Sequence, residues 1–104
     1  MLDKYILHGQ QPVPVEDVLE WASWLENADR RVAKDEVGGV GVSTVFLGID
    51  HQFGRGKPLL FETMIFGGVH DEYQTRCSTW EEAEVQHQEA LALVLEEQFK
   101  LPGE

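Results

Sequence analysis

The sequence has little cysteine, few cationic side chains and no long apolar run. Its 104 residues contain a single cysteine, Cys77, so no internal disulfide bond can form and a reducing compartment is favoured. The N-terminus has no basic segment followed by an apolar core, and no apolar run approaches the length that crosses a bilayer. We therefore expect a cytoplasmic protein that is neither secreted nor embedded in a membrane.

Positive charge is scarce, because eight Lys and Arg stand against nineteen Asp and Glu, for a formal net charge of −11 at pH 7. This charge repels the phosphates of nucleic acid and disfavours direct binding to them. It favours attraction to basic protein surfaces, including surfaces that normally hold DNA or RNA. The alternative is that the acidity serves only to keep the protein in solution.

Apolar and aromatic residues are abundant enough for a real core. The hydrophobic content is 42%, with three Trp and five Phe, which is typical of a folded chain rather than a disordered one. The length suits one domain, and neither an internal repeat nor a low-complexity linker divides it. We expect a single domain over residues 1–104.

The most strongly patterned stretch, residues 42–68, predicts the central hairpin of an antiparallel sheet. Placing Gly48 opposite Glu62 keeps the Glu62 carboxylate out of the core, where an unpaired charge is costly. In this register the core face carries Val45, Leu47, Ile49, Phe61, Thr63 and Ile65. The other face then carries Phe46, Met64 and Phe66, which are either covered by another part of the chain or form a partner-binding patch.

Other patterns predict two helices and further strands. Helical spacing of apolar residues predicts one helix over residues 15–28, in which one of Trp21 and Trp24 is buried and the other partly exposed. A second helix follows Ser78 and Glu81, which match a capping box. Short strands are expected at residues 4–7, 32–37 and 73–77. The predicted fold is α+β, an antiparallel sheet of about four to five strands with two helices packed on one face.

Few residues suggest chemistry. Asp50, His51, Glu62 and His70 form the one acid–histidine constellation, but no HxxxH, HExxH or paired-cysteine spacing accompanies them. His87 falls in the apolar stripe of the second helix and is expected to be a hydrogen-bonded core histidine. Cys77 is expected to be a small buried side chain. We therefore predict no catalytic residue, metal site or cofactor. A small metal-dependent or acid/base enzyme built on the four-residue constellation remains the alternative.

The acidic helix faces are the leading candidates for partner binding. They are usually solvated surfaces, and their functional interpretation is that their carboxylates imitate a run of phosphates. The predicted contact residues are Glu16, Asp17, Glu20, Glu26, Asp29, Phe46, Met64 and Phe66. The last three serve as an apolar alternative or as a homodimer surface.

Residues 43–51, 60–68 and 73–83, with the Pro-Val-Pro-Val-Glu-Asp segment at 12–17, resemble small uncharacterised proteins of tailed-phage and prophage genomes. The resemblance implies no activity and assigns no catalytic residue. It implies a phage accessory context in the host cytoplasm, where small acidic proteins often bind and inhibit host factors such as defence nucleases. The leading expectation is thus a non-enzymatic protein that binds a host protein with a basic surface. A structural homodimer is a further alternative.

Overall fold

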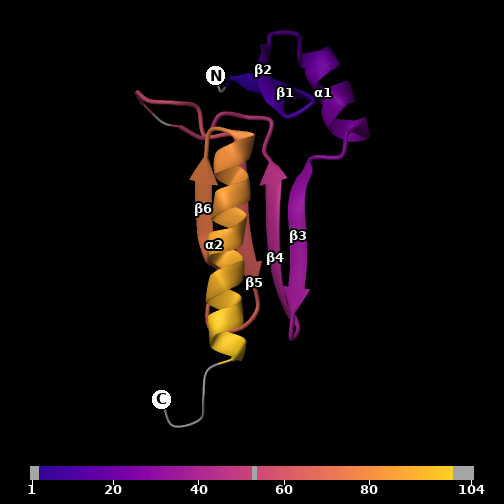
Figure 1. The fold of residues 1–104 in the computed structure, drawn as a ribbon. Helices are drawn as coiled ribbons and strands as arrows, with labels where there is room; N and C mark the ends of the chain where they lie inside the picture. The colour runs from indigo at the N-terminus through magenta and orange to yellow at the C-terminus, as the bar shows by residue number, and fades with distance from the viewer. Residues whose placement is uncertain (1–2, 53, 100–104) are drawn as a thin grey trace.

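The computed structural model describes residues 3–52 and 54–99, which form six strands and two helices (Figure 1). In chain order the elements are β1 (Lys4–His8), β2 (Gln11–Val15), α1 (Val18–Asn27), β3 (Arg31–Val37), β4 (Val40–Phe46), β5 (Phe61–Phe66), β6 (Gln74–Cys77) and α2 (Trp80–Gln98). β3 to β6 form a four-stranded antiparallel sheet in sequence order, and β1 and β2 form a separate hairpin. The predicted α+β class with an antiparallel sheet and two helices is confirmed.

The two helices pack against different sheets. α2 lies along one face of the four-stranded sheet, whereas α1 packs mainly against the β1–β2 hairpin at one end of the molecule (Figure 1). The expectation that both helices share one face of the sheet is therefore wrong for α1. The cause is the unexpected strand β2, which gives the N-terminal segment a small sheet of its own.

β2 forms despite its two prolines. Pro12 pairs with Leu7 and Pro14 with Tyr5, so both prolines fall at alternate positions of the ribbon. The backbone N–H of Tyr5 points away from β2, because it donates to the carbonyl of Gly48 at 2.9 Å. The prolines thus occupy pairs that exchange no hydrogen bonds, where a missing N–H costs nothing.

α1 begins later than the predicted residue 15. Asp17 is the N-cap, and its carboxylate accepts hydrogen bonds from the backbone N–H groups of Leu19 and Glu20 at 2.8 and 3.3 Å. An aspartate at this position satisfies N–H groups that have no partner within the helix. Trp21 and Trp24 are both half-buried, so the expected contrast between a buried and a partly exposed tryptophan is not found.

The register of the central hairpin differs from the prediction. Val45 rather than Gly48 lies opposite Glu62, and Phe46 lies opposite Phe61. The observed register differs from the predicted one by three residues. Because three is odd, the opposite side-chain face of β4 is buried, and Val40, Val42, Thr44 and Phe46 lie in the core. The predicted core face of β5, with Phe61, Thr63 and Ile65, is confirmed.

The core has an aromatic half and an aliphatic half. At the end of the sheet nearest the β1–β2 hairpin, the Phe46 ring lies 5.7 Å from that of Trp24 and 5.4 Å from that of Phe61, measured between ring centroids. The rings of Phe61 and Trp80 lie 6.2 Å apart. Further along α2, a second cluster of small and branched side chains comprises Val40, Val42, Ile65, Ala90 and Val94. Edge and tilted aromatic contacts add to the stabilisation that comes from burial.

The N-terminus of α2 is formed by the second of two overlapping sequence pairs that match a capping box. Two overlapping pairs fit the pattern, Ser78 with Glu81 and Thr79 with Glu82, and the structure uses the latter. The Thr79 hydroxyl accepts from the N–H of Glu82 at 3.1 Å, and the Glu82 carboxylate accepts from the N–H of Thr79 at 3.1 Å.

Candidate functional site

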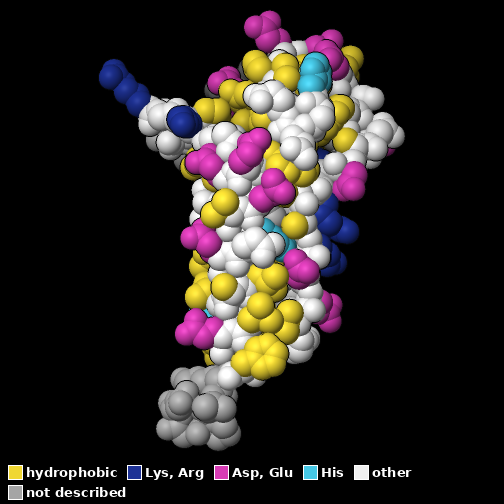
Figure 2. Space-filling view, viewed as in Figure 1, with side chains coloured by type: hydrophobic (Ala, Val, Ile, Leu, Met, Phe, Trp, Pro, Cys, Tyr) yellow, Lys and Arg dark blue, Asp and Glu magenta, His cyan; other side chains and the backbone are white. Residues whose placement is uncertain are grey.

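The outer face of α2 is strongly acidic. The helix contains six glutamates and no Lys or Arg, and its opposite face is buried through Ala83, His87, Ala90 and Val94. The glutamates are Glu81, Glu82, Glu84, Glu89, Glu96 and Glu97. Figure 2 shows acidic side chains along α2, while Lys and Arg gather on the projecting loop and on the β3 side of the same view. The exposed side of α2 is therefore an acidic surface without Lys or Arg of its own.

α2 itself contains no Lys or Arg to neutralise these carboxylates. Arg76 forms an ion pair with Glu62 rather than with a glutamate of α2, and Lys57 is near enough to Glu82 to contribute to the lowering of its pKa. Glu82 caps the helix, and Glu97 accepts a hydrogen bond from the N–H of Val69 at 3.2 Å. The remaining four glutamates face solvent, and a shallow groove of about 370 Å³ runs beside the first turns of the helix.

The predicted acidic residues of the first helix lie at the hairpin end of the molecule. Glu16, Glu20 and Glu26 are exposed. Asp17 and Asp29 are exposed too, but both also bond the backbone, because Asp29 accepts from the N–H of Arg31 at 3.0 Å. The predicted acidic set is therefore divided between the end of the molecule and the length of α2.

The structure separates the three predicted apolar contact residues. Phe46 is fully buried between Trp24 and Phe61, so its prediction as a partner-binding residue is wrong. Met64 is half-buried and Phe66 is 51% exposed, and both lie on the sheet face opposite α2. The error follows directly from the register shift, which moved Phe46 to the α2 side.

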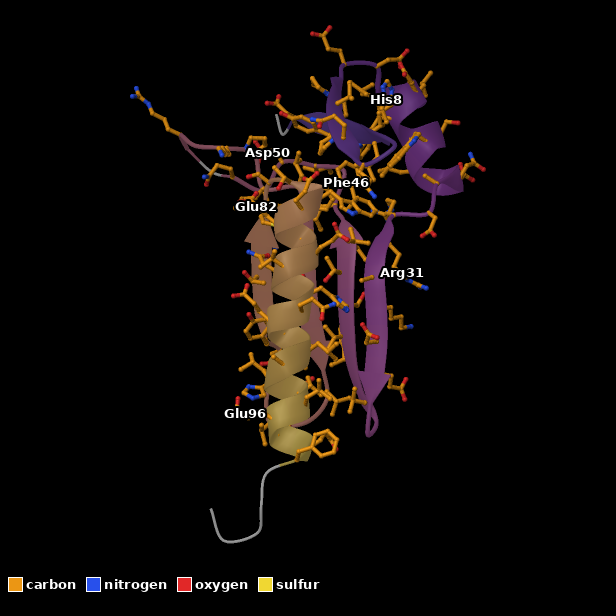
Figure 3. The ribbon with its side chains drawn as sticks, viewed as in Figure 1. His8, Arg31, Phe46, Asp50, Glu82 and Glu96 are labelled. Carbon is orange, nitrogen blue, oxygen red and sulfur yellow. The ribbon has the colours of Figure 1, made fainter. Side chains whose placement is uncertain are left out.

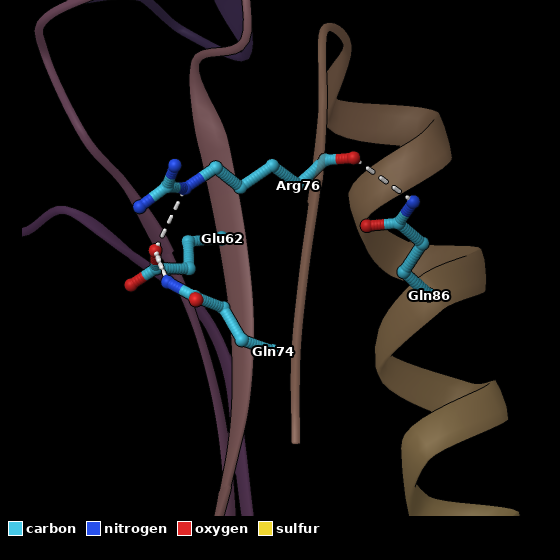
Figure 4. Close-up of polar contacts among 4 residues, drawn as sticks. All are labelled: Glu62, Gln74, Arg76 and Gln86. Atoms are coloured by element: carbon cyan, nitrogen blue, oxygen red, sulfur yellow. Dashed lines mark hydrogen bonds and ion pairs between the residues drawn. The ribbon is translucent and has the colours of Figure 1, made fainter. Parts of the chain in front are cut away.

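The acid–histidine constellation does not assemble. Glu62 pairs with Arg76 at 2.9 Å and accepts from Gln74, both on β6 (Figure 4). The carboxylate of Asp50 accepts from the N–H groups of Gln52 and Leu59 at 2.7 and 2.9 Å and closes the loop between β4 and β5.

His70 follows β5 at the opposite end of the strand from Asp50 and His51. Within the described ranges no three His, Cys, Asp or Glu side chains are grouped to hold a metal ion. The alternative site built on Asp50, His51, Glu62 and His70 is therefore not formed.

A buried polar network, not anticipated from the sequence, links α2 to three strands. The Nδ1 atom of His87 lies 2.8 Å from the Thr44 hydroxyl, which lies 2.6 Å from the hydroxyl of Thr63. The Nε2 atom of His87 lies 2.7 Å from the carboxylate of Asp35 on β3. Nε2–H donates to the Asp35 carboxylate and Nδ1 accepts from the Thr44 hydroxyl, so the buried polar atoms of this network are satisfied.

This order of carboxylate, imidazole and hydroxyl also occurs in nucleophilic enzymes, but here the hydroxyl is unreachable. Thr44, Thr63 and His87 are all 0% exposed beneath α2. A nucleophile must reach its substrate, and this one has no opening to solvent. The network fixes the position of α2 on the sheet, and the expectation that His87 is a hydrogen-bonded core histidine is confirmed.

Cys77 is a core side chain. It is 6% exposed and packs with Phe46, Leu60 and Phe61. Burial, followed by the nearby Glu82 carboxylate, raises the pKa of its thiol to about 11. The thiol is therefore protonated at neutral pH, which confirms the expectation of a small buried residue rather than a nucleophile.

Neither of the two described helices is long and apolar enough to cross a membrane. Comparisons with protein-family models, with curated proteins and with solved structures found no match.

Proposed function

We propose that this chain is a non-enzymatic accessory protein of phage type, which acts in the host cytoplasm. It binds a host protein with a basic, nucleic-acid-binding surface and inhibits that protein by occupying the surface. The observation that carries the proposal is the outer face of α2, a helix of 19 residues that contains five exposed glutamates and no Lys or Arg.

The spacing of these charges supports phosphate imitation. A helix of this length extends about 28 Å, so its carboxylates average roughly one per 5 Å along the axis. One strand of duplex DNA carries a phosphate about every 3.4 Å along its axis. The two densities are of the same order, so a groove that binds phosphates attracts this helix, while nucleic acid itself is repelled.

Rigid presentation favours binding further. α2 is held by the His87 network and by the capping box at Thr79 and Glu82, so the backbone that carries the carboxylates is in place before a partner arrives. A preorganised surface loses less conformational entropy on association than a flexible acidic tail. The acidic residues of α1, at the hairpin end, provide a second contact region.

The experiment is affinity capture from host lysate at low and high salt, with the bound proteins identified by mass spectrometry. We expect a basic nucleic-acid enzyme that is held at low salt and released at high salt, and whose activity falls when the protein is added. Binding that is indifferent to salt contradicts the charge mechanism.

Matched charge variants then locate the contact. Glu84→Gln/Glu89→Gln removes two charges from the outer face of α2, whereas Asp3→Asn/Glu72→Gln removes two exposed charges elsewhere. We expect the first variant to weaken capture at least tenfold and the second to leave it nearly unchanged. A third variant, Glu20→Gln/Glu26→Gln, measures how much the carboxylates of α1 contribute to the strength of capture. Equal losses from the first two variants indicate only a net-charge effect and overturn the assignment to α2.

A further inference from the structure

The sheet face opposite α2 is open. α2 is the only described element that packs broadly against the four-stranded sheet, and it covers one face (Figure 1). Along β4 and β5 the side chains alternate between the two faces, so Val45, Met64 and Phe66 project from the open one. A sheet that buries one face only leaves the other to water or to a partner.

Three apolar side chains, Val45, Met64 and Phe66, follow one another along the open face from one end of β5 to the other. Phe66 is 51% exposed and lies beside Gly41, whose added Cβ would be 4.0 Å from the Cβ of Phe66. Because Gly41 has no side chain, the phenyl ring has only bare backbone beside it. Val45 and Met64 continue the apolar surface toward the other end of the strands. Phe and Met are enriched in protein interfaces.

The charges of the open face are balanced, unlike those of the chain as a whole. Its charged side chains are Arg31, Lys34, Arg76, Glu36 and Glu62, three cations and two carboxylates, whereas the whole chain has a formal charge of −11. Two copies of so acidic a protein repel each other least through the surface without an excess of acid. A basic partner, by contrast, is drawn to α2.

The face is also self-complementary. Arg31 pairs across from Val45 near one end of β3, and Glu36 pairs across from Gly41 near the other end. A two-fold axis that crosses the strands therefore brings Arg31 of one copy toward Glu36 of the other. A two-fold interface requires that one patch complement itself in this way.

We propose that the open faces of two copies pack together to form a homodimer, with the two α2 helices on the outside. Four strands of six residues span roughly 19 by 20 Å, or about 400 Å² in projection per copy. Side chains make the accessible area larger than its projection, which brings the pair close to the roughly 1,000 Å² of a specific interface. We therefore expect a dimer that dissociates in the micromolar range. It rests on other residues than the proposed function, so the two can fail separately.

Sedimentation equilibrium over a series of concentrations tests the dimer. We expect wild type to pass from monomer to dimer, and Phe66→Glu to raise the dissociation constant at least tenfold. Val85→Glu is the matched control, because Val85 is similarly exposed, at 58%, but lies on α2. Circular dichroism checks that both variants are folded. A wild-type monomer at all concentrations, or a dimer that Phe66→Glu leaves intact, overturns the proposal.

Cross-linking tests the same surface while its apolar side chains are left unchanged. Ser43 lies on the open face opposite Met64, and Ser23 is exposed on α1. We expect a short bismaleimide to join two copies of Ser43→Cys and not two copies of Ser23→Cys, while buried Cys77 does not react. Cross-linking of Ser23→Cys alone, or of neither variant, contradicts a dimer through this face.

Discussion

The indole Nε1–H of Trp21 donates a hydrogen bond of 2.9 Å to the carbonyl of Gly48, which also accepts from the N–H of Tyr5 at 2.9 Å. One carbonyl oxygen beyond the end of β4 therefore holds both α1 and the β1–β2 hairpin. Gly48 adopts a φ of +80°, and a Cβ at this position would lie 2.8 Å from Cδ2 of Leu25. Glycine is required here both for the backbone conformation and for the close approach of α1.

Gly48→Ala is expected to destabilise the protein by about 2 kcal/mol, because it combines positive-φ strain with a contact against Leu25. Gly9→Ala is the control, since Gly9 has a φ of +63° but nothing within 4 Å of its added Cβ. The control should cost only about 1 kcal/mol, from the backbone alone. Urea unfolding measures both. Equal losses would show that the Leu25 contact contributes nothing.

Thr44→Val is expected to destabilise the protein by roughly 2 kcal/mol, because it leaves Nδ1 of His87 and the hydroxyl of Thr63 without their buried partner. Thr63→Val leaves the bond between Thr44 and His87 in place and should cost less. A double-mutant cycle by urea unfolding measures their coupling, and the double variant should lose less than the sum of the single variants. Strict additivity would show that the two hydroxyls act independently.

The capping box makes stability depend on pH. The hydrogen bond from the Thr79 side chain is the first cause that holds the pKa of Glu82 below its ordinary value of 4.5. A pKa lowered by folding contributes stability above about pH 4.5, and this stability is lost as the pH falls through the folded-state value. Glu82→Gln should therefore flatten the loss of stability in acid, as measured by thermal unfolding between pH 3 and 7.

Because Glu82 is exposed to solvent, its lowered pKa contributes well under 1 kcal/mol to the free energy of unfolding at pH 7. Glu81→Gln is the matched control, because Glu81 is the preceding exposed glutamate and the structure uses Glu82 in the box. An identical acid profile for wild type and Glu82→Gln would contradict the role of this carboxylate.

Cys77 is expected to resist alkylation in the folded protein. Its pKa of about 11 leaves roughly one thiol in a thousand ionised at pH 8, and burial blocks access to that fraction. Iodoacetamide labelling followed by mass spectrometry should be at least a hundredfold slower in buffer than in urea. Ser23→Cys supplies an exposed thiol for comparison. Labelling of Cys77 at the same rate as this thiol would show that the core opens readily.

In Figure 3, Glu82 and Glu96 mark the two ends of the acidic helix, and Phe46 lies at the end of the sheet nearest the β1–β2 hairpin. The acidic face could be anticipated from the sequence, because helical periodicity separates its glutamates from the buried Ala83, His87, Ala90 and Val94. Phe46 could not be placed in this way, since its side of the sheet depends on the register.

The sequence by itself determined the local elements. Gly38 and Gly39 form the turn between β3 and β4, the edge strand β3 carries charged side chains, and α2 follows from its cap and periodicity. These features depend on residues close together in the chain, where backbone preference and side-chain period act directly.

Only the tertiary structure decided the register of β4 and the packing of α1 against the β1–β2 hairpin. β4 is apolar on both faces, through Val42 and Phe46 on one and Val45 on the other, so alternation alone does not select its buried side. The long loop before β5 imposes no register either. Contact with α2 selects it, because buried His87 requires a polar partner and the observed register provides the hydroxyl of Thr44.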